Sequence, residues 1–121
     1  MRQAEALVGQ FRELTVRRIA SSPYARCVQT VEPLARARGV RVEAAPGLTE
    51  GAGPDWTLDV LSHDDGAVLC SHADVIGEVV MTLTDRGVPL EGGMQCEKGS
   101  TWAFESQNGR IVAGRYIPPP Q

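Results

Sequence analysis

The chain has 121 residues, of which 42% are hydrophobic and 22% charged, so its size and composition are those of one ordinary globular domain. This composition excludes a disordered tail, a collagen-like fibre and a membrane-spanning segment. The formal net charge of −3 provides no basic field for nucleic acid, so no nucleic-acid partner is expected. Three cysteines without a Cys-x-x-Cys pair, and no apolar signal segment, predict a reduced, cytoplasmic protein.

The first third of the chain alternates between helix and strand patterns. Apolar residues at helical spacing predict a helix over Met1–Leu14, which no capping residue precedes. A short strand is expected over Val16–Ser21. The next helix is predicted over Pro23–Arg38, with Ser22 as its N-cap and Gly39 as its end.

The middle of the chain continues this alternation. Val40–Ala44 alternates like a strand, and Pro46–Pro54 is a turn-rich loop. A helix is expected over Asp55–Leu61, closed by the polar turn at 63–66. Ala67–Ser71 is continuously apolar, which is typical of a strand buried on both faces of a parallel sheet.

The last part predicts one more helix and a hairpin. Asp74 caps a helix that extends to about Arg86. After a glycine-rich loop over Glu91–Gly99, two strands over Ser100–Glu105 and Ile111–Tyr116 flank an Asn-Gly turn, a strong hairpin signal. The whole order predicts a three-layer α/β domain: a largely parallel sheet with helices on both faces, followed by a C-terminal hairpin.

Two segments place reactive side chains where strands end. Ligands bind at the carboxyl ends of the strands in such sheets, where helix N-termini also point. Arg26 lies in the first turn of the helix after one strand, and His72 follows another strand directly. A guanidinium fork and an imidazole there suggest an oxyanion or phosphoryl site. The alternatives are that Arg26 is a solvated helix residue and that His72 is a capping or partly buried histidine.

The remaining reactive residues favour structural roles. Cys27 lies on the apolar stripe of its helix, which indicates packing rather than nucleophilic chemistry. His63 lies in a polar turn and is expected at the surface. The spacing of Cys70, His72, His63 and Cys96 matches no structural zinc pattern, so no metal is expected.

Several segments resemble one known family. Residues 21–30 (SSPYARCVQT) closely resemble the SSPxxRxxQT segment of the histidine phosphatase (phosphoglycerate mutase-like) superfamily. Residues 2–7 are similar to the helix upstream of that segment, 69–72 to the second histidine motif, and 48–50 to the acidic loop. Residues 96–102 and the YIPPP ending resemble the phosphatase half of actinobacterial Nudix–histidine phosphatase fusions.

The resemblance implies a phosphoglycerate mutase-like fold and a hydrolase that needs neither metal nor cofactor. In the family a histidine nucleophile takes the phosphoryl group and water then releases it. By motif, Arg26 would be the second phosphate-clamping arginine and His72 the second histidine. Glu50 would be the proton donor, and Ser22 would add a hydrogen bond to the phosphate. The implied partners are a small phosphorylated substrate or phosphohistidine and a fused or separate Nudix domain, with no membrane.

One departure from the family concerns the nucleophile. The family's first strand ends in Arg-His-Gly or Arg-His-Ala, and this sequence contains neither motif. We therefore expect residues 1–121 to be a single histidine-phosphatase-like domain that is N-terminally incomplete, with its first strand missing and with little or no hydrolase activity. The alternatives are a pseudo-phosphatase that acts as a phosphate-binding or interaction module, and an unrelated α/β domain.

Overall fold

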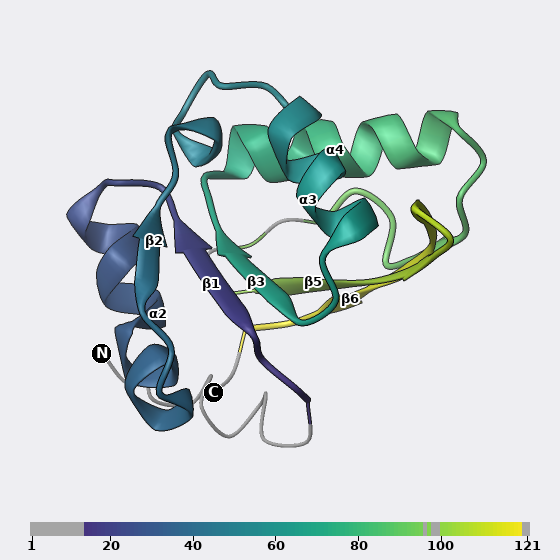
Figure 1. Ribbon diagram of the computed structural model, residues 1–121. Coiled ribbons are helices and arrows are strands. Elements are labelled where there is room, and N and C mark those ends of the chain that lie inside the picture. The colour runs from purple at the N-terminus through teal and green to yellow at the C-terminus, as the bar shows by residue number, and fades with distance from the viewer. Residues whose placement is uncertain (1–13, 96, 98–99, 120–121) are drawn as a thin grey trace.

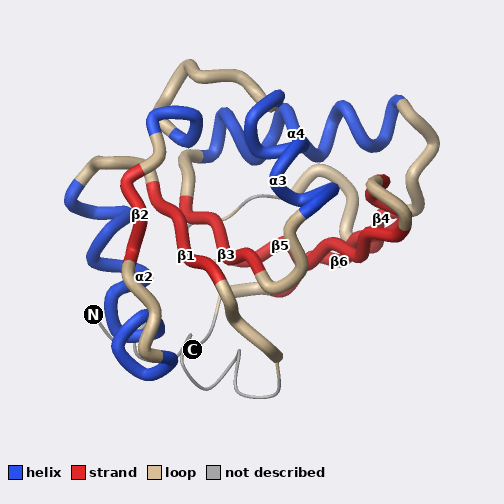
Figure 2. The backbone as a smooth tube through the Cα atoms, in the orientation of Figure 1, coloured by secondary structure: helices blue, strands red, loops and turns tan. Residues whose placement is uncertain are grey.

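The structure is a computed structural model that describes residues 14–95, 97 and 100–119. The helix predicted over residues 1–14 lies outside the described residues, except for its last position, and so does Cys96. Helices and strands alternate over most of the described chain, which ends in three consecutive strands (Figures 1 and 2). In chain order the elements are β1 (Arg18–Ser21), α2 (Ala25–Arg38), β2 (Val42–Ala44), the 3-10 helix η1 (Pro46–Leu48), α3 (Asp55–His63), β3 (Ala67–Cys70), α4 (Ala73–Asp85), β4 (Leu90–Glu91), β5 (Thr101–Gln107) and β6 (Arg110–Ile117).

The first sheet is parallel, with strand order β2-β1-β3. Helix α2 covers one of its faces. Ile19 of the central strand and Leu34 of α2 are both fully buried there, and Val42 and Val68 pack beside them. Each such aliphatic side chain stabilises the fold by about 1.5–3 kcal/mol through removal from water. Gly39 ends the helix with a positive φ of 66°, as the sequence predicts.

The opposite face of this sheet is covered by η1 and the start of α3. Ala20 and Leu48 are fully buried on this side, and Trp56 and Leu69 pack against them. The sheet therefore has helical elements on both faces, and the three-layer α/β architecture predicted from the sequence is confirmed.

A second sheet, with strand order β4-β6-β5, holds the C-terminal hairpin. Strands β5 and β6 pair antiparallel, and positive φ angles at Asn108 (53°) and Gly109 (76°) form the tight turn between them. Helices α3 and α4 pack on this sheet through Leu58, Leu83 and Ile111. The two-residue strand β4, which pairs with β6, is absent from the sequence prediction.

Three local predictions are wrong. Tyr24 rather than Ser22 is the N-cap position of α2, and His72 rather than Asp74 is that of α4. Strand β3 was expected to be buried on both faces, but all four of its residues are only half-buried. The cause is its position, because β3 lies at the edge of the first sheet instead of inside it. In the described part of the chain, no helix combines the length and apolar character needed to cross a bilayer.

Candidate functional site

The site begins where β1 and β3 end. Because these neighbouring strands are parallel, their carboxyl ends meet at one edge of the sheet (Figure 1). The amide of Ser22 donates to the carbonyl oxygen of Cys70 at 2.9 Å, which extends the pairing one step beyond β1. This bond brings the chain after β1, which leads into α2, beside the chain after β3, which leads into α4.

His72 lies at the centre of this edge. Its Nε2 is 2.9 Å from the Oγ of Ser22, a hydroxyl that is fully buried, and 3.9 Å from the Sγ of Cys27. The ring of Tyr24 meets the imidazole edge-on, with 4.8 Å between the ring centroids. Contacts from three residues of the β1–α2 segment thus fix the position of the imidazole, whose side chain is 18% exposed.

Glu50 approaches the other nitrogen of the same ring. Its Oε1 is 3.9 Å from the Nδ1 of His72, and its side chain is 63% exposed. Two hydrogen bonds tie this loop to the β3–α4 junction: Ser71 Oγ donates to the Leu48 carbonyl oxygen at 2.7 Å, and the Gly51 amide donates to Asp74 Oδ2 at 2.8 Å. The acidic loop is therefore anchored on both sides of Glu50. Asp74, predicted as a helix cap, serves this anchor instead.

Arg26 extends from the first turn of α2 and is exposed. It lines the same large cavity as His72 and Glu50. Within the described part of the chain its guanidinium forms no ion pair, so the charge is available to an anion. The structure thus gathers all four site residues predicted from the sequence: Ser22, Arg26, Glu50 and His72.

The cavity beside these residues has a volume of about 1190 Å³ and lies between the two sheets. Its walls include Leu69 of β3 and Trp102 and Phe104 of β5. Thr57 also lines it, and the Oγ1 of this residue is buried without a hydrogen-bond partner among the described residues.

Two thiols form the inner wall of the cavity next to His72. Cys27 is buried and Cys70 is half-buried, and both are free cysteines. Burial, followed by the electrostatic and hydrogen-bonding effects of Cys27, raises the pKa of the Cys70 thiol to about 12. Cys70 is therefore protonated at neutral pH. Sequence reasoning placed Cys27 in the packing of its helix but missed its contact with His72.

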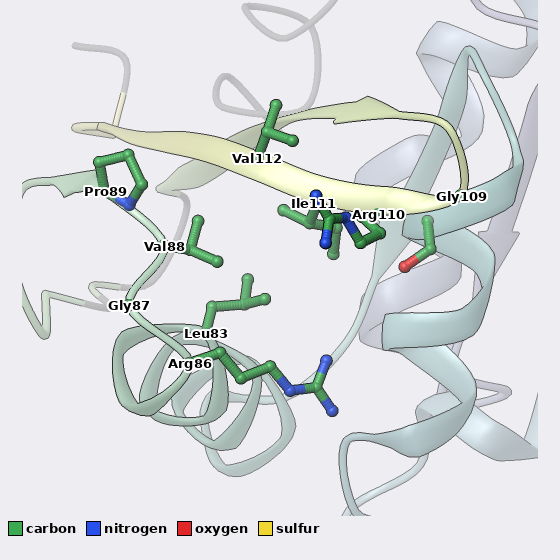
Figure 3. Close-up of a pocket in the computed structure, with 10 residues that line it drawn as sticks. Leu83, Arg86, Gly87, Val88, Pro89, Gly109, Arg110, Ile111 and Val112 are labelled. Carbon is green, nitrogen blue, oxygen red and sulfur yellow. The ribbon is translucent and has the colours of Figure 1, made fainter.

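A second cavity, of about 400 Å³, lies between the end of α4 and β6. Figure 3 shows Leu83, Val88 and Ile111 between these elements, with Arg86 and Arg110 near them. None of the four predicted site residues lines this cavity. The second cavity therefore lies apart from the predicted site.

The other histidine lies apart from the site. His63 is the last residue of α3, is 61% exposed, and has its Nδ1 2.9 Å from the Asp59 carbonyl oxygen. Sequence reasoning missed the contact of Tyr24 with His72 and the buried hydroxyl of Thr57. For Tyr24 one signal was available, because it lies between Ser22 and Arg26 in the turn that joins the predicted strand to the next helix.

Comparisons with known proteins agree with this geometry. A family model described as histidine phosphatase superfamily (branch 1) matches residues 1–59, a range that includes Ser22, Arg26 and Glu50. A protein of Mycolicibacterium smegmatis named 8-oxo-(d)GTP phosphatase is 29% identical over 125 residues. The match covers 98% of this chain but only 39% of that relative's length. The chain is therefore similar to the histidine phosphatase superfamily over residues 1–59, and to this phosphatase-named relative over nearly its whole length.

Proposed function

We propose that the site at the ends of β1 and β3 binds the phosphoryl group of a small phosphorylated substrate, as part of a phosphomonoester hydrolase of the histidine phosphatase type. The observation that carries this proposal is the convergence of Arg26 and His72 on one cavity, with Ser22 hydrogen-bonded to His72 at 2.9 Å. A fixed fork of guanidinium donors and an imidazole suit the oxygens of a phosphoryl group.

Each residue has a distinct part in this proposal. Arg26 binds two equatorial oxygens and stabilises the charge that they gain during transfer. His72 donates a hydrogen bond to a third oxygen, and the buried Ser22 hydroxyl fixes the orientation of its ring. Glu50 is exposed at the cavity and protonates the leaving oxygen, after which its carboxylate can activate a water.

The nucleophile requires a further histidine, because His72 already has a binding role and His63 lies elsewhere on α3. We propose that a strand ending in Arg-His-Gly or Arg-His-Ala occupies the cavity between β3 and β5 in the complete catalytic unit. Strand β3 is continuously apolar yet half-buried, and its residues together with those of β5 line this cavity. A strand parallel to β3 there would end beside His72, where a nucleophile is needed.

The proposed substrate class is supported by the relative's name, and the proposed partner by the resemblance of residues 96–102 and the YIPPP ending. Its name gives an oxidised guanine nucleotide as its substrate, and the present chain spans about two fifths of its length. We propose a nucleotide-type phosphate as the substrate class, and a Nudix domain as the fused or separate partner.

The alternative function, a pseudo-phosphatase, uses the same residues for phosphate binding without turnover. Its support is that the four gathered residues include an arginine and a histidine for binding, while the sequence holds no Arg-His-Gly motif. The two functions differ in one observable. When a strand ending in Arg-His-Gly is added to the protein, a phosphatase should form phosphohistidine on that strand, whereas a binding module should form none.

Phosphate binding is tested by thermal unfolding with inorganic phosphate or orthovanadate at millimolar concentration. A ligand at tenfold its Kd stabilises the folded state by about 1.4 kcal/mol, which corresponds to about 5 °C in Tm for a domain of this size. Arg26→Ala should remove this rise. Arg36→Ala, the same change in the last turn of α2, should retain it. No rise in Tm in the wild type, or an equal rise in Tm in Arg26→Ala, would contradict the proposal.

A further inference from the structure

A pair of cysteines adjoins the proposed phosphate site. Cys27 comes from the first turns of α2 and Cys70 from the last position of β3, and both side chains line the large cavity. Helix α2 packs against β3, and Cys27 is among the causes of the raised pKa of the Cys70 thiol, so the two side chains are neighbours. The positions are 43 residues apart in sequence, so the fold alone brings these sulfurs together.

The sulfur of Cys27 also contacts the proposed phosphate site. Cys27 Sγ lies 3.9 Å from His72 Nε2, the nitrogen to which the buried Ser22 hydroxyl is hydrogen-bonded. An imidazole next to a thiol can accept its proton and leave a thiolate, which is the reactive form of cysteine. Cys70 is half-buried at the wall of a cavity large enough to admit a small oxidant.

We propose that Cys27 and Cys70 are a redox-sensitive pair that hydrogen peroxide converts into a disulfide, and that this disulfide weakens phosphate binding at His72 and Arg26. The second half of this statement rests on the proposed function, whereas the first half does not.

The oxidation proceeds in two balanced steps. In the first step Cys27 gives its proton to His72, and the Cys27 thiolate attacks one oxygen of peroxide. The O–O bond breaks and Cys27 becomes a sulfenic acid. The released hydroxide takes the proton from His72 and leaves as water. The Cys70 thiol then attacks the sulfenic sulfur, and a second water leaves as the S–S bond forms. Two thiols lose two electrons in total and peroxide gains them. Because Cys70 must lose its proton in this second step, and burial raises its pKa to about 12, that step should accelerate as the pH rises.

The disulfide would act on the site through Cys27. Bonding to Cys70 takes the Cys27 sulfur away from His72 Nε2 and joins the start of α2 covalently to the end of β3. Arg26 directly precedes Cys27, so the same bond restrains the guanidinium that would close on a phosphate. Oxidised protein should therefore bind phosphate more weakly, and a thiol reductant should restore binding.

Disulfide formation is measured by peroxide treatment, alkylation of the remaining thiols and tryptic peptide mapping. The three cysteines fall in separate tryptic peptides, residues 27–36, 42–86 and 87–98, so each pairing is distinguishable. We expect the first two peptides to be cross-linked, in the wild type and equally in Cys96→Ser. Cys27→Ser and Cys70→Ser should not form that cross-link. Independent sulfenic acids, or a cross-link that includes Cys96, would overturn the proposal.

The effect on the site is measured on the Cys96→Ser variant with phosphate-induced thermal shifts before oxidation, after oxidation, and after reduction. The account predicts a rise in the reduced protein that falls by at least half on oxidation and returns on reduction. An unchanged rise despite complete cross-linking would overturn the redox proposal alone. Absence of the rise in the reduced protein would contradict the proposed function, while the peptide map would still decide the pairing.

Discussion

Ser22→Ala tests how the imidazole of His72 is positioned. The Ser22 side chain is fully buried, and its hydroxyl is 2.9 Å from His72 Nε2. Its removal deletes one neutral hydrogen bond, with a net cost of about 1 kcal/mol. For a chain of this length that is about 4 °C in Tm. The cost stays near this value because the His72 side chain is 18% exposed, so water can satisfy the abandoned nitrogen in part.

The same substitution should also weaken phosphate binding. Without the hydroxyl the His72 ring can rotate, and fixing it again when phosphate binds should cost about 1 kcal/mol of binding free energy. This cost corresponds to an increase in Kd of about fivefold. Ser62→Ala is the matched control, because that hydroxyl donates only to the Leu58 carbonyl oxygen within its own helix, away from the site. Thermal unfolding and phosphate titration of the three proteins give both quantities. A Ser22→Ala protein as stable and as tight a binder as Ser62→Ala would refute this reasoning.

Two further predictions concern stability. The Arg18 guanidinium donates a hydrogen bond to Glu43 and so lowers the pKa of that carboxyl below its ordinary value of 4.5. The pair therefore stabilises the fold above pH 4.5, and this contribution is lost as the pH falls through the lowered pKa of Glu43. The Tm difference between wild type and Glu43→Gln should therefore be small but measurable at neutral pH and should vanish in acid; a constant difference would contradict it. Gly92→Ala should cost about 2–3 kcal/mol in urea unfolding, since its φ is +118° and the new Cβ would lie 2.4 Å from Tyr116 Cβ. Gly93→Ala, at φ +65° with open space around it, should cost only about 1 kcal/mol; equal costs would mean that the clash is absent.

Local patterns in the sequence were sufficient to predict most elements. The short strand pattern before Ser22, the glycine at 39 and the Asn-Gly turn at 108–109 each act over a few residues. The structure has β1, the end of α2 and the hairpin at those places. The residue order also placed Arg26 and His72 at strand ends. Parallel pairing of β1 with β3 then brings them to one edge.

Predictions failed where a long-range contact competes with a local preference. A serine before a proline usually caps a helix, but the Ser22 hydroxyl is bonded instead to a histidine 50 positions away in the chain. Asp74 likewise binds the amide of Gly51 instead of capping α4. The contact of Cys27 with His72, and the Thr57 hydroxyl that has no partner among the described residues, depend on how α2 and α3 dock on the sheet, which no short pattern encodes.

The central claim, that His72 belongs to a phosphate site, is tested most directly by imidazole nitrogen NMR during a titration with inorganic phosphate. The chain has two histidines, and His63 is an internal control because it is exposed on α3 and bonded to its own helix. The account predicts saturable shifts of the His72 ring nitrogens with no comparable change at His63, and the loss of those shifts in Arg26→Ala. Equal, non-saturating shifts at both histidines would contradict it.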